Sequence, residues 1–214
     1  MLLFSSFADN VVRFYSTGHG CPHAGEPRLG SMSDSSPQRQ RILDAAVAIL
    51  AQHGQSGLTV RAVATASDFS TTGIYTWFGG KDGLLEAIYT DGFARFRADL
   101  AEADTELDPR RRLLLSGERY WDWALANPTH YLLMFSGVPS AFTPSAAAVH
   151  DAGLAFVDLV ERVAAVTSED VAHHFWATLH GYAMLQIAAP DLPNAEARVR
   201  LQRGLERLVT PLAR

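Results

Sequence analysis

The chain has 214 residues and a net charge of −5, with 48% hydrophobic and 19% charged residues. This composition predicts a folded globular protein and argues against a protein that coats nucleic acid nonspecifically. It does not exclude a protein that binds a specific nucleic-acid sequence through locally placed cations. The single cysteine, Cys21, excludes an internal disulfide framework and fits a reducing cytosol. No apolar run approaches the ~20 residues that span a bilayer, so we expect a cytoplasmic protein without a membrane partner.

Residues 1–36 are expected to form a disordered leader or linker. The first residues are briefly apolar but include Asp9, so they fit a secretory signal poorly. They match a transit peptide slightly better, although Asp9 weakens that match as well. The stretch 16–38 is rich in Gly, Ser and Pro, as flexible linkers are. Met32 is an alternative to Met1 as the true start of the protein.

Almost everything after Ser36 is helical by pattern. Apolar residues recur with a 3.6-residue period, and Gly54 and Gly79 are expected to end helices. No segment combines sustained alternation with β-branched residues, so no sheet is expected. The fold class is therefore all-α, with about nine helices. Their expected starts lie at or beside Ser36-Pro37, Thr59, Ser70, Lys81, Asp108-Pro109, Asn127-Pro128, Thr143-Pro144, Ser168 and Asn194.

We expect two folded domains that meet near residue 89. Residues 37–89 form a three-helix DNA-binding head in this prediction, and residues 90–214 form a larger body for ligand binding and dimerisation. The fourth helix contains residues of both domains, so it could transmit movement between them.

The segment from Thr59 to Lys81 reads TVRAVATASDFSTTGIYTWFGGK and predicts two short helices joined by a tight turn. A helix-turn-helix needs a small residue where its helices pack, which Ala64 supplies, and apolar residues around the turn. The turn usually takes glycine because its backbone is left-handed, whereas here Asp68 occupies it and tolerates that conformation better than most residues. On pattern alone, a DNA-reading motif and a helical hairpin within an all-α core both remain open.

The exposed face of the second helix would present four hydroxyl groups to DNA. Hydroxyls bond to base edges or phosphates, and threonine methyls contact thymine methyls. Because this face carries no Arg, Asn or Gln, phosphate contacts, apolar contacts and DNA shape should contribute more of the specificity. Arg39 and Arg41 could add electrostatic attraction. The predicted DNA-binding residues are Thr59, Arg61, Ser70, Thr71, Thr72, Tyr75, Thr76, Trp77 and Lys81.

Together with QRILDAAVAILAQHG before it and KDGLLEAIY after it, this segment resembles the DNA-binding head of the TetR family of bacterial regulators. Asp68 and Thr72 depart from the small residues that are usual in the family. The resemblance implies a homodimeric repressor that binds a palindromic operator in double-stranded DNA and releases it when a small molecule binds the body. The resemblance is carried by the Thr59 cap, the Phe69-Ser70 pair, the Tyr75…Phe78 pair and KDGLL.

The second half resembles, less sharply, a common TetR-like C-terminal domain through ERYWDWALANPTHYLLMFSG and through FWATLHGYAMLQI with its His-Gly pair. This half is rich in aromatic residues, which could line an apolar cavity for a small hydrophobic ligand or simply fill the core. His180 is a possible polar contact in such a cavity. The predicted ligand-binding residues are Trp121, Leu125, Tyr131, Met134, Phe135, Phe142, Phe156, Trp176, His180 and Met184.

The last two helices are the expected dimer interface. Ala177 and Gly181 are small residues four apart, which allows close approach of helices, and the final helix carries an apolar stripe. An intramolecular packing face is the alternative. The predicted interface residues are Ala177, Gly181, Val199, Leu205, Leu208 and Leu212.

We expect no catalytic residue, metal or cofactor. Asp170, His173, His174 and His180 invite a metal interpretation, but no second carboxylate–histidine pair completes the ligand set. The sequence also has no phosphate loop after a strand, no Gly-x-Ser-x-Gly elbow and no paired Glu-x-x-His motif. An all-α carrier or enzyme that uses the aromatic cavity remains the alternative to a regulator.

Overall fold

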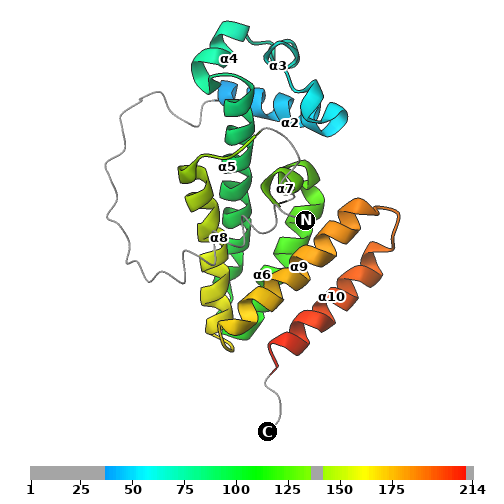
Figure 1. Ribbon diagram of the computed structural model, residues 1–214. Helices are drawn as coiled ribbons and strands as arrows, with labels where there is room; N and C mark the ends of the chain where they lie inside the picture. The colour runs from blue at the N-terminus through cyan, green and yellow to red at the C-terminus, as the bar shows by residue number, and fades with distance from the viewer. Residues whose placement is uncertain (1–36, 136–141, 211–214) are drawn as a thin grey trace, which may run out of the picture. The chain divides into compact units, whose positions relative to one another are not determined.

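The computed structural model describes residues 37–135 and 142–210. Within these ranges every regular element is a helix, which confirms the predicted all-α fold with nine α-helices and adds one short 3₁₀ helix (Figure 1). In the described part of the chain, no helix has the length and apolarity to cross a membrane. The elements are α2 (Pro37–Gly57), α3 (Val60–Ser67), α4 (Thr71–Phe78), α5 (Lys81–Ala101), η1 (Glu102–Thr105), α6 (Pro109–Ala126), α7 (Pro128–Phe135), α8 (Ala146–Ala164), α9 (Asp170–Ala188) and α10 (Asn194–Leu208).

The helices belong to two compact units. The first, which we call the head unit, contains the described residues 37–89, 132–135 and 142–145, and the second, the body unit, contains residues 90–131 and 146–210. Helix α5 contributes residues to both units.

In the head unit, the short helices α3 and α4 begin and end at residues that satisfy their terminal backbone groups. The Thr59 and Ser70 hydroxyls accept hydrogen bonds from the amides of residues 62 and 73, as the capping prediction required. Asp68 ends α3 with φ 53° and ψ 49°, so the predicted left-handed turn is present without glycine. Gly79 ends α4 with φ 73°, and its amide donates to the Tyr75 carbonyl at 2.9 Å.

The head unit has a core of fully buried aliphatic side chains contributed by α2 to α5. Each has at most 1% of its surface exposed, so α2, α3, α4 and the first half of α5 share one apolar centre. Gly54 interrupts α2 at the position where the sequence analysis expected a helix to end. It makes a non-helical kink with φ 62°, after which the helix continues to Gly57. The core residues are Ile42, Leu43, Ala46, Leu58, Val63, Ile74, Leu84, Leu85 and Ile88.

In the body unit, α9 packs against α6, α8 and α10, and α6 packs against α8 and α10 (Figure 1). Polar contacts attach α10 to α6: the Arg198 guanidinium pairs with both Asp122 oxygens at 2.7 and 3.0 Å. The Arg110 guanidinium donates to the Val209 carbonyl at 2.7 Å, just beyond the end of α10. The last helix is therefore anchored at both ends within the same protomer.

Three helix starts differ by one or two residues from those expected. Helix α8 begins at Ala146 and not beside Thr143-Pro144, and Glu169 rather than Ser168 precedes α9. Asn194 is the first residue of α10, with Pro193 at the cap position, and no side-chain cap bond is formed there. The starts of α9 and α10 have no side-chain cap bond of the kind that locates α3, α4 and α6, so the sequence predicts them less sharply.

Candidate DNA-binding surface and ligand-binding body

Helix α4 presents its hydroxyl groups to solvent and its apolar groups to the core of the head unit. Thr71, Thr72 and Thr76 are exposed, and Tyr75 has 58% of its surface exposed, as the prediction of a DNA-reading face requires. Ile74 is fully buried on the opposite side. An eight-residue helix with this polarity can place four hydroxyl-bearing side chains against a groove without opening the core.

The turn before α4 is closed by an aromatic contact that sequence analysis missed. The Phe69 and Trp77 rings lie with centroids 5.0 Å apart, and Phe69 crosses Gly73 so closely that a Cβ there would lie 2.2 Å from the ring. Gly73 is therefore required for close ring approach and not for backbone freedom. Trp77 is half-buried in this contact, so its predicted role in DNA binding is limited to its exposed part.

The cations of the head unit differ in how much they are engaged within the protein. The Lys81 ammonium donates to the Gln55 carbonyl, the Arg41 guanidinium donates to the Ser67 carbonyl at 2.9 Å, and Arg39 lies over the Phe78 ring. Arg61 is exposed, and in the described ranges its side chain has no hydrogen-bond or ion-pair partner. Arg61 is consequently the cation best placed to neutralise a phosphate without first breaking an internal contact.

The body unit contains a buried chain of polar aromatic groups. The hydroxyls of Tyr120 and Tyr131 are 2.9 Å apart, and the Tyr131 hydroxyl is 2.7 Å from His180 Nδ1. His180 is stacked between Tyr131 and Trp176, with ring centroids 5.5 and 5.4 Å apart, and Phe156 meets Trp176 edge-on. We call Tyr120, Tyr131, Phe156, Trp176 and His180 the aromatic cluster. It brings together four predicted ligand-binding residues and adds Tyr120, which was not predicted.

Burial keeps the aromatic cluster electrically neutral. It lowers the pKa of His180 to about 4, so the imidazole carries no charge at pH 7. Burial also raises the pKa of Tyr120, against the opposite effect of hydrogen bonds with Tyr131 and Trp176. The pKa of Tyr131 is raised by burial and by its Tyr120 neighbour. The cluster therefore offers hydrogen-bonding groups and aromatic faces but no net charge.

The other predicted ligand-binding residues are spread over both units. Trp121, at 1% exposure, belongs to the body unit, and in the described part of the chain its indole N–H has no hydrogen-bond partner. Leu125 and Met184 of the body unit are half-buried. Met134, Phe135 and Phe142 belong to the head unit, where Met134 is buried. Their participation in one site with the aromatic cluster stays a prediction.

The histidines that invited a metal interpretation have separate partners. The His173 ring contacts Phe156, His174 Nδ1 lies 3.3 Å from the Asp170 carbonyl, and His180 belongs to the aromatic cluster. In residues 37–135 and 142–210, no three metal-ligating side chains gather at one point.

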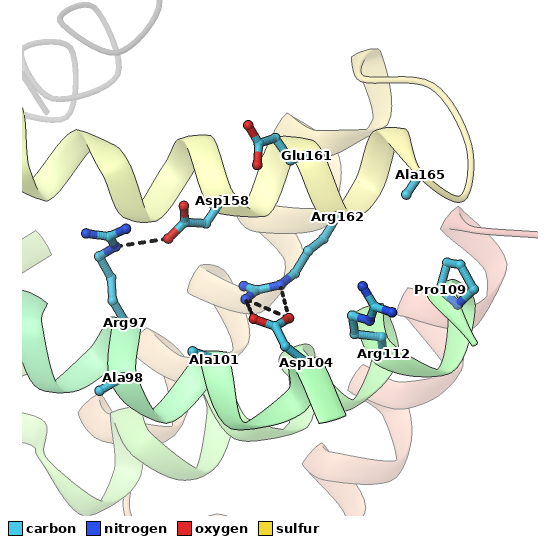
Figure 2. A pocket seen from close by; sticks show the side chains of 10 residues that line it. All are labelled: Arg97, Ala98, Ala101, Asp104, Pro109, Arg112, Asp158, Glu161, Arg162 and Ala165. Atoms are coloured by element: carbon cyan, nitrogen blue, oxygen red, sulfur yellow. Dashed lines mark hydrogen bonds and ion pairs between the residues drawn. The ribbon is translucent and has the colours of Figure 1, made fainter. Parts of the chain in front are cut away.

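A pocket with a different character lies elsewhere in the body unit and was not predicted. It has a volume of about 600 Å³, and charged side chains from α5, η1, α6 and α8 line it (Figure 2). Its residues come from segments about 60 positions apart in the sequence, and no local motif marks them.

Most of the predicted dimer-interface residues on α9 and α10 have accessible surface. Ala177 and Val199 are exposed, Gly181 and Leu208 are partly exposed, and a Cβ built on Gly181 meets no atom within 4 Å. Leu205 is 1% exposed, so its side chain is already covered within the protomer and has little surface left for a partner. Leu212 lies outside the described residues.

A helix-turn-helix head with a separate helical body defines a class of DNA-binding regulatory proteins. Two family models match the chain: bacterial regulatory proteins of the tetR family at residues 42–88, and the tetracyclin repressor-like C-terminal domain at residues 113–209. The chain belongs to the TetR family. Both models describe regulators, and these comparisons confirm the prediction that the chain is not an enzyme.

Individual relatives agree with this assignment. The chain is 35% identical over 85 residues to the HTH-type transcriptional repressor AcnR of Corynebacterium glutamicum, covering 40% of this chain and 44% of that protein. The matches span between a third and about half the length of such curated relatives. The fold resembles that of a transcriptional regulator from Rhodococcus sp. Rha1, with a TM-score of 0.68 and 23% identity, and the match covers 82% of this chain and 100% of that one. It also resembles that of FadR from Bacillus subtilis in complex with stearoyl-CoA, with a TM-score of 0.67 and 13% identity, and this match covers 81% of this chain and 99% of that one.

Proposed function

We propose that the protein is a cytoplasmic transcription regulator, a homodimeric repressor that binds a palindromic operator and releases it when a small hydrophobic molecule binds the body. The observation that carries this proposal is the exposed hydroxyl face of α4, with Tyr75 58% exposed above a fully buried Ile74. Such a helix can enter a major groove, because its contacting side chains project away from the core that holds it.

The DNA contacts that we propose combine phosphate and groove interactions. Thr71, Thr72, Tyr75 and Thr76 would meet base edges and sugar-phosphate groups, while Arg61 would pair with a phosphate. The hydroxyl and methyl groups of the three threonines discriminate between bases less sharply than a bidentate arginine would. Sequence preference should therefore depend in part on DNA shape.

The proposed ligand is uncharged and largely apolar. The aromatic cluster has no net charge at pH 7, because burial keeps the His180 imidazole neutral. Apart from its ring faces, it offers the hydroxyl–hydroxyl–imidazole chain for a hydrogen bond. The Trp121 indole of the same unit is a buried donor without a partner in the described ranges. A molecule with one carbonyl or hydroxyl on an apolar frame would match these groups.

The proposed dimer uses the accessible sides of α9 and α10. Leu185 has 66% of its surface exposed and Val199 has 43%, so a dimer that covers both side chains would remove apolar surface from water. Ala177 and Gly181 add small side chains on α9 that permit a partner helix to approach closely. Two copies related by a two-fold axis would then present their α4 helices about one DNA turn apart, roughly 34–36 Å.

A selection experiment tests the DNA-binding part. The purified protein is mixed with random-sequence duplexes, and the bound fraction is sequenced after several rounds. We expect an inverted repeat, and affinity for it should fall steeply with salt. Tyr75→Phe should weaken binding to most sequences alike, whereas Tyr182→Phe, which makes the same chemical change on α9, should leave binding unchanged. Recovery of duplexes without a shared sequence would contradict the proposal.

A second experiment tests release by a ligand. Compounds from a panel of uncharged apolar molecules are first selected by quenching of tryptophan fluorescence, and their effect on affinity for the selected duplex is then measured. A ligand that binds the DNA-free protein more tightly than the DNA-bound protein should weaken DNA binding by the ratio of these two affinities. Unchanged DNA affinity at saturating concentrations of every compound that binds would refute the proposed regulation.

A further inference from the structure

The charged pocket of the body unit lies between the second half of α5 with η1 on one side and α8 on the other, and the start of α6 closes one end (Figure 2). Its volume of about 600 Å³ lies within the range of small-molecule sites. The ten lining residues include three arginines and three acidic residues: Arg97, Arg112, Arg162, Asp104, Asp158 and Glu161.

Two of the acidic residues are already neutralised by arginines across the pocket. Arg97 Nε on α5 donates to Asp158 Oδ2 on α8 at 2.9 Å. The Arg162 guanidinium on α8 binds both oxygens of Asp104 on η1, at 3.0 and 3.1 Å. The pairs run in opposite directions between the two sides, so each side contributes one cation and one anion.

Arg112 has no carboxylate partner among the described residues. Its Nε donates to the Glu106 carbonyl at 2.8 Å, and Nη2 makes a longer contact with the Leu107 carbonyl at 3.4 Å. These backbone bonds fix the guanidinium at the pocket while leaving its positive charge unpaired. In the described ranges, Nη1 of Arg112 and both Nη atoms of Arg97 make no hydrogen bond.

The remaining acidic residue does not compensate this charge. Glu161 is exposed, and its carboxylate points away from the guanidinium groups of Arg112 and Arg162 (Figure 2). The interior of the pocket thus has one cation more than its paired carboxylates, in a protein whose net charge is −5. Planar guanidinium groups with unused N–H donors are the groups that best match carboxylate and phosphate oxygens.

We propose that this pocket is a binding site for a small anion that carries a carboxylate or phosphate group, held by the unused guanidinium donors of Arg112. The site is separate from the neutral aromatic cluster. Its proposed ligand is an anion, whereas the ligand proposed for the aromatic cluster is uncharged. It does not depend on the proposed DNA-binding function, because it rests only on the charges and donors of the body unit.

Arginine side-chain NMR tests the proposal directly. The full chain, labelled with ¹⁵N, is titrated with inorganic phosphate and separately with acetate, while sodium chloride keeps the ionic strength constant. We expect a saturable shift of the Nε–Hε signal of Arg112, assigned by substitution. A response to phosphate alone identifies a phosphate site, a response to acetate alone identifies a carboxylate site, and either outcome supports the proposal.

Matched variants make the result specific. Arg112→Gln should weaken anion binding about tenfold, the loss expected for one charge-assisted hydrogen bond. Arg111→Gln, the same change at an exposed neighbour that does not line the pocket, should leave binding unchanged. Arg112→Lys keeps the charge but not the planar fork, and it serves as a second folded variant if Arg112→Gln lowers the melting temperature. Shifts that do not saturate, or binding that is equally strong in Arg112→Gln, would overturn the proposal.

Discussion

Replacement of His180 by glutamine should remove a defined part of the pH dependence of stability. The structure holds this imidazole neutral, with its pKa lowered to about 4 because burial penalises the charged form. In the unfolded chain the group regains a pKa of about 6.5. Between these values the unfolded chain binds more protons than the folded protein, so the free energy of unfolding must fall as the pH is lowered.

The size of the effect follows from this difference in pKa. The full shift corresponds to about 3 kcal/mol, present above pH 6.5 and lost as the pH falls towards 4. Between pH 7 and pH 5 the contribution of His180 should be about 2 kcal/mol. His180→Gln contains no titrating group and should lack this contribution. It should also be less stable at pH 7, because the Tyr131 hydroxyl loses its 2.7 Å partner.

Urea unfolding at fixed protein concentration, followed by circular dichroism at pH 7, 6 and 5, measures these differences. His174→Gln is the matched control, since it makes the same substitution at an exposed position of the same helix. Other groups titrate in both proteins, so the comparison uses the difference in slope between His180→Gln and His174→Gln. Equal slopes would refute the reasoning and indicate that the imidazole titrates in the folded state near its ordinary pKa.

Substitutions at three further sites, two of them with a matched control, test packing and helix ends by thermal or urea unfolding. Ser70→Ala should lower the free energy of unfolding by about 1 kcal/mol, because the hydroxyl caps α4, and no measurable loss would contradict this role. Asp68→Ala should cost about 1 kcal/mol at φ 53°, whereas Asp68→Gly should be the more stable of the two, and the reverse order would exclude left-handed strain. Gly117→Ala should cost about 1–3 kcal/mol, since its Cβ would lie 2.8 Å from Leu205 Cδ1, while Gly153→Ala, with open space around it, should gain up to about 1 kcal/mol. Similar effects of both glycine substitutions would show that helix propensity, not packing, decides them.

The sequence predicted those features that local chemistry determines. A hydroxyl at a cap position binds the backbone three residues later, so the starts of α3 and α4 could be located from Thr59 and Ser70 alone. The same holds for Asp108, whose carboxylate accepts from the amide of residue 111 at 2.7 Å. The apolar period then determined which side of α4 faces the core, and hence which hydroxyls are exposed.

Tertiary contacts account for what the sequence could not predict. The Tyr131–His180 bond joins residues 49 positions apart, and the Arg97–Asp158 pair joins residues 61 apart. Neither pairing has a periodic signal, because each depends on how helices that are distant in sequence pack together.

The body unit thus contains two groups of polar side chains with opposite electrostatic character, and salt should separate their ligands. Binding of an anion at Arg112 depends on a guanidinium at a pocket open to solvent, so it should weaken as ionic strength rises. Binding of an uncharged apolar molecule at the aromatic cluster removes apolar surface from water, and added salt should leave it unchanged or strengthen it. A single compound that binds both regions would show an intermediate salt response, and Arg112→Gln would abolish only the part that falls with salt. The salt response of the melting temperature, measured with each compound, therefore assigns a ligand to its region without reference to DNA.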